Sequence, residues 1–245
     1  MSRLTESDNR GRLSLPEVTI VSINGKNPEK SIAAIRHSSL EIDFGRQLLI
    51  TNRPIPLEAS GKIEVLVEQK LNSLIDYNRF CLLELHDRIE TEFCLIVQPD
   101  GFVVHPSLWS DFFLRYDYIG APWNHLRSRE LIQLSGHQYK DIPIPIVGNG
   151  GFSLRSRRLL KQVASLKPDT TRLPEDCVIS VILRSELENA GMLFAPHRLA
   201  QQFSLEWHID QFSVIGNHFG FHGLFAHFEP YLKITAMDRD SRSLT

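Results

Sequence analysis

Apolar runs and the polar residues between them divide the chain into alternating strands and helices. Continuous apolar or β-branched runs predict strands at residues 18–23, 46–51, 62–67, 93–97 and 192–195. Helical spacing of apolar residues, with Pro near the start of two segments, predicts helices at residues 28–39, 71–89, 155–166 and 174–190. This alternation predicts an α/β fold: one Rossmann-like domain with a mostly parallel central sheet and helices on both faces.

The strand predicted at residues 93–97 ends in a candidate ligand site. Pro99 stops the strand, and Asp100 follows at its carboxyl end, before Gly101. Ligands of open α/β sheets bind at this end of the strands, where a carboxylate can hold a divalent cation or a ribose hydroxyl. Taken alone, Pro-Asp-Gly is equally typical of a turn.

Polar residues also follow the first two predicted strands. Ser22 and Asn24 end the first, and Asn52 follows the second. In a parallel sheet these residues would border the same crevice, where they would contact a nucleotide base and ribose. They are just as typical of turns.

Three later segments contain residues that could bind a ligand or take part in catalysis. Gly148, Asn149, Gly150 and Gly151 form a glycine-rich segment that fits neither a phosphate loop nor a dinucleotide fingerprint. Glu175 and Asp176 lie at a predicted helix start, where carboxylates are favoured by the helix dipole and where one could serve as a general base. His222 lies next to Gly223 in a glycine- and aromatic-rich segment, which leaves it accessible.

Composition narrows the function classes. The 245 residues are 42% hydrophobic and 23% charged, which is typical of a globular domain, and the net charge of −2 gives no support for nucleic acid as a partner. Three cysteines lie far apart and form neither metal spacing nor a disulfide framework. No apolar run approaches the roughly 20 residues of a transmembrane helix, and the N-terminus lacks a signal-peptide core.

Together these segments resemble known families. The segments concerned are Gln98-Pro-Asp100, Tyr-Asp-Tyr-Ile-Gly-Ala-Pro-Trp at 116–123, the glycine-rich segment continuing to 156, Pro-Glu-Asp at 174–176 and Phe-Gly-Phe-His-Gly at 219–223. As a set, they resemble a bacterial and viral domain-of-unknown-function family assigned to GT-A glycosyltransferases. Their order is also similar, more distantly, to that of fringe-like β-1,3-glycosyltransferases. The resemblance covers roughly residues 18–223. We therefore expect a GT-A-like domain at 16–232, between a polar, disordered tail at 1–15 and a C-terminal tail at 233–245.

The resemblance implies roles for individual residues. Asp100 corresponds to the last residue of the Asp-x-Asp motif and His222 to a C-terminal ligand of Mn²⁺ or Mg²⁺, while Asp176 corresponds to the catalytic base, with Glu175 beside it. Gln98 replaces the first Asp of the motif, which puts strict metal dependence in doubt. With the strand-end residues given above, the residues expected at the nucleotide are Ser22, Asn24, Asn52, Gln98 and Asp100. The residues expected in the acceptor and sugar pocket are Trp123, Asn149, Gly150, Gly151 and Trp207. Trp123, Tyr118 and Trp207 are candidates for stacking on a sugar, and core packing is expected for at least one of the three.

The implied function is transfer of a sugar from a nucleotide-sugar, such as a UDP-hexose with galactose in pyranose or furanose form, to a saccharide or glycolipid acceptor. We expect inversion at the anomeric carbon and a place in cell-surface polysaccharide assembly, in the cytoplasm or at the inner face of the membrane by peripheral association. Two alternatives remain: a retaining transferase on the same fold, and a non-catalytic nucleotide- or sugar-binding module, which Gln98 favours. The polar residues 128–141 are expected to form a loop beside the pocket.

Overall fold

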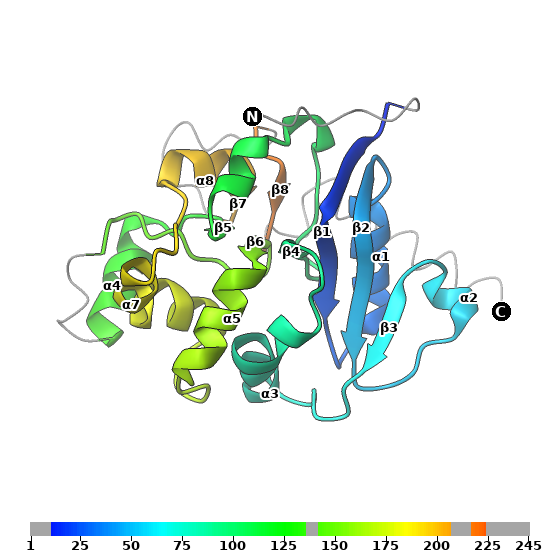
Figure 1. Cartoon of the computed structure of the whole chain (residues 1–245), viewed down its shortest axis with the longest axis horizontal. Coiled ribbons are helices and arrows are strands. Elements are labelled where there is room, and N and C mark those ends of the chain that lie inside the picture. The colour runs from blue at the N-terminus through cyan, green and yellow to red at the C-terminus, as the bar shows by residue number, and fades with distance from the viewer. Residues whose placement is uncertain (1–10, 136–141, 207–216, 224–245) are drawn as a thin grey trace.

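The computed structural model describes residues 11–135, 142–206 and 217–223. Their main sheet has six strands in the order β3-β2-β1-β4-β6-β5 (Figure 1). The strands are β1 Leu13–Ile23, β2 Ile42–Thr51, β3 Glu64–Val67, β4 Phe93–Ile96, β5 Tyr118–Gly120 and β6 Ser153–Ser156. A separate parallel pair joins β7 Ser204–Leu205 to β8 Gly220–Phe221.

Helices connect and cover the strands. They are α1 Pro28–Ser38, α2 Leu57–Ser60, α3 Leu74–Arg79, α4 His125–Ser135, α5 Arg157–Leu166, α6 Glu175–Cys177, α7 Arg184–Asn189 and α8 His197–Phe203. α3 and α6 each continue into a π-helical turn, Phe80–Glu84 and Val178–Ile182. Short 3₁₀ turns occupy Leu85–Asp87, Pro106–Leu108 and Asp111–Arg115.

The sheet is mostly parallel, which confirms the predicted fold class. β1 pairs in parallel with β2 and with β4, in a register that places Val21 opposite Leu48 and Ile96. β3 extends the parallel part, whereas β6 is antiparallel to β4, and β5 is antiparallel to β6. The inner strands are apolar on both sides because helices cover both faces.

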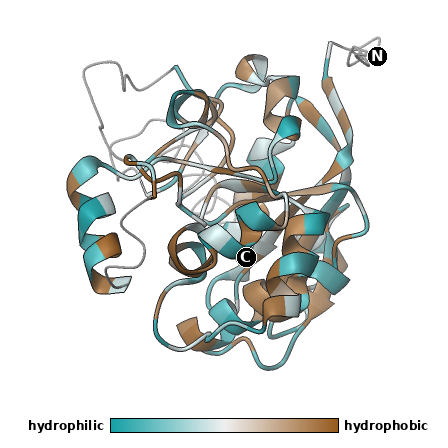
Figure 2. Ribbon diagram, turned by 60° about the vertical axis from the view of Figure 1, so that its left-hand side comes forward, coloured by the Kyte–Doolittle hydropathy of each residue, from teal (hydrophilic) through white to brown (hydrophobic). Residues whose placement is uncertain are grey.

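Each face of the sheet packs against its own helices. On one face Ile20, Leu49 and Leu95 pack with Ile32 and Ile35 of α1. On the opposite face the next residues along the same strands pack against the π-helical turn after α3 and against Leu160 of α5. Hydrophobic and hydrophilic segments alternate along the helices in Figure 2, as expected for helices that are apolar on one side only.

The first strand begins earlier than predicted. Leu13 and Leu15 were expected in a disordered tail, but they pair with Ile42 and Phe44 of β2, and Leu15 is fully buried. The register shifts between Leu15 and Thr19. Pro16 lies within this irregularity, where a residue without an N–H is tolerated. This break conceals the continuity of the strand in the sequence pattern.

Two other predictions were wrong. Residues 128–135 belong to α4 rather than to a loop, because the Asn124 side chain caps the helix by accepting a hydrogen bond from the Arg127 N–H at 2.8 Å, and Leu131 is buried. The remainder of that predicted loop, 136–141, lies outside the described residues. Residues 192–195 do not form a strand, and Phe194 makes only an isolated bridge to Tyr118.

The described residues contain no helix with both the length and the apolar run that crossing a membrane requires.

Candidate active site

The C-terminal segment carries His222 to the loop that follows β4. The Val104 N–H donates to the Phe219 carbonyl at 2.9 Å, and the Gly223 N–H donates to the Asp100 carbonyl at 2.9 Å. These backbone bonds place His222 Nε2 3.7 Å from Asp100 Oδ1. The structure thus brings together two predicted residues that are far apart in the sequence.

Both nitrogens of His222 have polar neighbours. Gln98 Oε1 lies 3.1 Å from Nε2, while Asn149 Nδ2 and Glu206 Oε1 lie 2.8 Å and 3.4 Å from Nδ1. Gln98 is itself oriented because its amide nitrogen donates to the Tyr77 hydroxyl at 3.1 Å. This amide therefore joins Tyr77 to the imidazole.

The charge of His222 is set by opposing effects. Burial alone would lower the pKa of this imidazole, but the hydrogen bond with Glu206 and the negative charges of Asp100, Glu206 and Asp176 hold the pKa above its ordinary value. A proton and a metal cation would compete for Nε2, since only the neutral imidazole offers a lone pair there.

The side-chain atoms around Asp100 and His222 suit a divalent cation, but they are few. Among the described residues, no group of three or more His, Cys, Asp and Glu side chains is arranged to hold a metal. A cation here would rest on Asp100 and His222, with the amide oxygen of Gln98 as a third protein ligand. This set suits Mg²⁺ or Mn²⁺, which are commonly held by one or two carboxylates together with substrate phosphates. Glu206 would orient His222 from its other nitrogen, and Glu206 Oε2 is buried with no hydrogen-bond partner.

The glycine-rich segment lies against this cluster. Asn149 has φ of +44°, and its Oδ1 accepts from the Phe152 N–H at 3.1 Å, which closes a tight turn. A Cβ atom on Gly151 would lie 2.2 Å from the His222 ring, and one on Gly150 would lie 2.1 Å from Glu175 Oε1. Glycine is therefore required here for close approach.

Asp176 faces the same segment from the start of α6. Its Oδ2 accepts from the Gly150 N–H at 2.8 Å, and its Oδ1 accepts from the Cys177 N–H at 2.8 Å. The side chain is half-buried, so it remains within reach of a ligand. Each oxygen retains a lone pair that can accept a proton from a hydroxyl.

Glu175 points the other way, into the protein. Its two oxygens accept from Arg155 Nη1 and Nη2 at 2.7 and 2.9 Å, and both side chains are almost fully buried. Burial opposes charge on Arg155, but Glu175 holds the Arg155 pKa well above its usual value. The geometry makes Glu175 a structural partner of Arg155, not the second catalytic carboxylate that the sequence suggested.

A cavity of about 280 Å³ lies at the carboxyl ends of β1 and β4. Leu71, Leu74 and Tyr77 supply apolar and aromatic walls, and Lys26 and Gln98 add polar groups. Because Gln98 also contacts His222, the cavity adjoins the Asp100 cluster.

The predicted nucleotide residues behave differently from one another. Ser22 is fully buried within β1 and does not line this cavity, which corrects its assignment to the donor site. Asn24 lines the cavity, but its Oδ1 accepts from the Lys26 N–H, so its side chain also shapes the turn. Asn52 donates to the Leu71 carbonyl and thereby holds the opposite wall.

The predicted stacking aromatics are used in the core. Trp123 is 5% exposed and packs with Leu131 and Ile146, while Tyr118 is fully buried and donates to the Gly148 carbonyl at 3.0 Å. Neither ring is available to a sugar, because the segment after β5 pairs with the chain leading into the glycine-rich segment. Trp207 lies outside the described residues.

Three site residues escaped the sequence analysis. Glu206, Tyr77 and Arg155 each contact a predicted residue. Glu206 and Tyr77 lie outside the motifs that the sequence analysis used. Arg155 lies within the segment that continues from the glycines to 156, which was the one signal that could have pointed to it.

A known protein family matches much of the chain. The family DUF5672, described as a protein of unknown function, matches residues 61–222. No curated protein matches the sequence.

Solved structures with a similar chain path include several glycosyltransferases. The galactosyltransferase LgtC, in complex with donor and acceptor sugar analogs, is 12% identical over 91% of this chain and 95% of its own, with a TM-score of 0.49. The glycosyltransferase GlyE of Streptococcus pneumoniae TIGR4 is 10% identical over 91% and 61%, with a TM-score of 0.49. The mannosyltransferase PcManGT of Pyrobaculum calidifontis, in complex with GDP-Man and Mn²⁺, is 12% identical over 68% and 52%, with a TM-score of 0.41. At this level of similarity, only the geometry of the site itself bears on function.

Replacing Glu175 should destabilise the fold strongly. In Glu175→Gln the Arg155 guanidinium stays buried without its counter-charge, and we expect a loss of about 3–5 kcal/mol in the free energy of unfolding, measured by urea denaturation. Glu188→Gln is the matched control, because Glu188 pairs with Arg184 but is 47% exposed, and we expect a loss below about 1 kcal/mol. Equal losses in the two variants would contradict a structural role for the buried pair.

Proposed function

We propose that this chain, which belongs to the DUF5672 family, is a GT-A-like glycosyltransferase that uses a nucleotide-sugar donor. The observation that carries the proposal is the arrangement of Asp100, His222 and Asp176 around one glycine-rich segment. Ligands of open α/β sheets bind outside the carboxyl ends of the strands, and this cluster adjoins the cavity there.

The donor is proposed to lie with its nucleoside in the 280 Å³ cavity and its diphosphate toward Asp100 and His222. The cavity offers Tyr77 as an aromatic wall and the Lys26 ammonium as a counter-charge. The proposed donor is a UDP-hexose such as UDP-galactose.

A bound Mn²⁺ or Mg²⁺ would neutralise the charge that develops on the departing diphosphate. The protein orients the side chains that would bind the cation: Tyr77 fixes Gln98, and Asn149 and Glu206 fix His222. Because one ligand is a neutral amide, we propose that the cation binds together with the donor phosphates rather than to the free protein.

Asp176 is the proposed base of an inverting transfer. It accepts the proton of an acceptor hydroxyl, the hydroxyl oxygen bonds to the anomeric carbon, and the bond from that carbon to the diphosphate breaks. Hydrogen bonds from the backbone of Gly150 and Cys177 fix the orientation of the carboxylate.

The acceptor is proposed to be a saccharide or glycolipid, as expected for cell-surface polysaccharide assembly at the cytoplasmic face of the membrane. The support is chemical: the reaction needs a hydroxyl nucleophile, and the half-buried Asp176 carboxylate can accept its proton.

Removing the basicity of Asp176 tests the transfer directly. Asp176→Asn keeps the shape of the side chain, so we expect turnover to fall roughly 10²–10⁴-fold while donor affinity stays nearly unchanged. Radiolabelled sugar transfer and calorimetric titration of UDP measure the two quantities. Asp169→Asn, a change of the same chemistry in an exposed turn, is the control and should keep wild-type turnover. Turnover by Asp176→Asn close to the wild-type rate would contradict an Asp176 base.

Changing the ligand charge tests the cation site. Gln98→Glu preserves length and places a carboxylate beside Asp100 and His222, so Mn²⁺ should bind about tenfold more tightly in the presence of UDP. Asp100→Asn should weaken Mn²⁺ binding by about tenfold or more. Calorimetry measures both, and Gln69→Glu, which adds the same charge at an exposed position, should have no effect. If Mn²⁺ affinity is unchanged in Gln98→Glu and in Asp100→Asn, the cation does not bind between these residues.

A further inference from the structure

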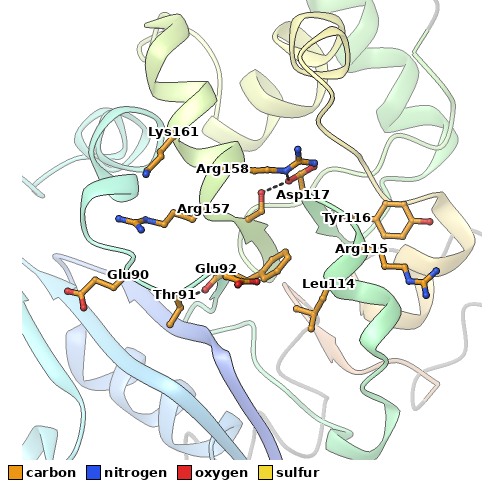
Figure 3. A pocket seen from close by; sticks show the side chains of 12 residues that line it. Glu90, Thr91, Glu92, Leu114, Arg115, Tyr116, Asp117, Arg157, Arg158 and Lys161 are labelled. Carbon is orange, nitrogen blue, oxygen red and sulfur yellow. Dashed lines mark hydrogen bonds and ion pairs between the residues drawn. The ribbon is translucent and has the colours of Figure 1, made fainter. Parts of the chain in front are cut away.

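A second cavity, of about 470 Å³, lies at the start of β4, whereas the proposed donor site lies at the carboxyl end of that strand. It is bounded by the start of β4, the end of β6 with the first residues of α5, and the 3₁₀ turn Asp111–Arg115 (Figure 3). None of the residues placed in the donor or catalytic site lines it. We call it the basic cavity.

Two cationic side chains line one side of the basic cavity. Arg157 and Lys161 lie one turn apart on α5, whereas Arg115, on the 3₁₀ turn at the other side, points away from them and lies over the Phe112 ring, 4.4 Å from its centroid (Figure 3). In the described part of the chain, none of these three side chains takes part in an ion pair. Arg157 Nε is moreover buried and has no hydrogen-bond partner. Leaving a buried donor unsatisfied costs free energy that a bound acceptor would recover.

Of the three anionic side chains that line the cavity, Asp117 is compensated by a cation of the lining. Asp117 is buried and paired with Arg158, and it also accepts from the Ser156 hydroxyl and the Leu193 N–H. Glu90 is 79% exposed and lies 3.4 Å from Arg46, which is outside the cavity and already pairs with Glu64. Glu90 and Glu92 therefore offset part of the positive charge of Arg157 and Lys161. The unsatisfied Arg157 Nε still favours a bound anion at this side of the cavity.

The rest of the lining suits the body of a small molecule. Phe93, Leu114 and Tyr116 offer apolar and aromatic surface, and the Tyr116 hydroxyl adds a hydrogen-bonding group. The amino end of α5 opens onto the same space, and its dipole favours negative charge there. A volume of this size falls in the usual range of small-molecule sites.

From these observations we infer that the basic cavity is a second binding site, for a sugar phosphate carrying a phosphomonoester group. The phosphomonoester has a charge near −2 at neutral pH and accepts hydrogen bonds from guanidinium groups in paired geometry. Arg157 and Lys161 bind the phosphate, and the sugar lies against Phe93. The inference does not depend on the proposed transfer activity, because no residue is shared between the two sites.

Calorimetric titration with glucose 6-phosphate at low ionic strength tests the site. We expect saturable binding, with inorganic phosphate about tenfold weaker and glucose without measurable affinity. The double variant Arg157→Ala, Lys161→Ala should weaken glucose 6-phosphate binding by about tenfold or more. Neither side chain takes part in a hydrogen bond or ion pair within the described residues, and an unchanged melting temperature would show that the fold is intact.

Two controls locate the binding. Lys62→Ala removes an exposed cation elsewhere, and Asp100→Ala alters the donor site; both should leave glucose 6-phosphate affinity within about twofold of the wild type. The inference is overturned if glucose 6-phosphate does not bind, if inorganic phosphate binds equally well, or if the double variant binds like the wild type. It is also overturned if Asp100→Ala abolishes the binding, because the ligand would then occupy the donor site.

Discussion

The site depends on one buried ion pair, between Arg155 at the centre of β6 and Glu175 at the start of α6. Two buried charges are tolerated only when their pairing is nearly complete, and here both oxygens of the carboxylate accept from the guanidinium, whose Nε also donates to Ser153. The pair fixes α6 against the sheet. Asp176, the next residue, is thereby turned outward to the backbone of Gly150.

The same pair explains the glycine-rich segment. Glu175 lies so close to Gly150 that a side chain there would collide with it, and the His222 ring fills the corresponding space at Gly151. The segment thus separates the carboxylate that is proposed to act on the acceptor from the Asp100 and His222 cluster that is proposed to face the donor. A transferase needs this arrangement, since the hydroxyl and the departing diphosphate lie on opposite sides of the anomeric carbon in an inverting reaction.

The sequence predicted those elements that are specified by residues next to one another in the chain. The apolar runs of the parallel strands, the Pro at the start of α1 and the turn chemistry around Asp100 each follow from neighbouring residues, and so they were predicted. It failed where a residue's role depends on a distant partner. Trp123 and Tyr118 could equally face a sugar or the core, and only the pairing of the chain around Gly148 turns them inward. Likewise, α4 has a polar sequence that forms a helix because Asn124 caps it and Ser128 turns inward to the Ile146 N–H. Glu206 meets His222 only through the pairing of β7 with β8.

The carboxyl ends of β1 and β4 are proposed to bind a nucleotide-sugar together with a cation. A thermal-shift measurement of the full chain with UDP-, GDP- and ADP-sugars, each with and without Mn²⁺, tests this proposal most directly. A ligand at 100 times its Kd stabilises the native state by about 2.7 kcal/mol, so one nucleotide class, expected to be the uridine one, should raise the melting temperature by roughly 5–10 °C, and more with Mn²⁺ than without. Melting temperatures that no nucleotide-sugar changes, with or without Mn²⁺, would contradict the account.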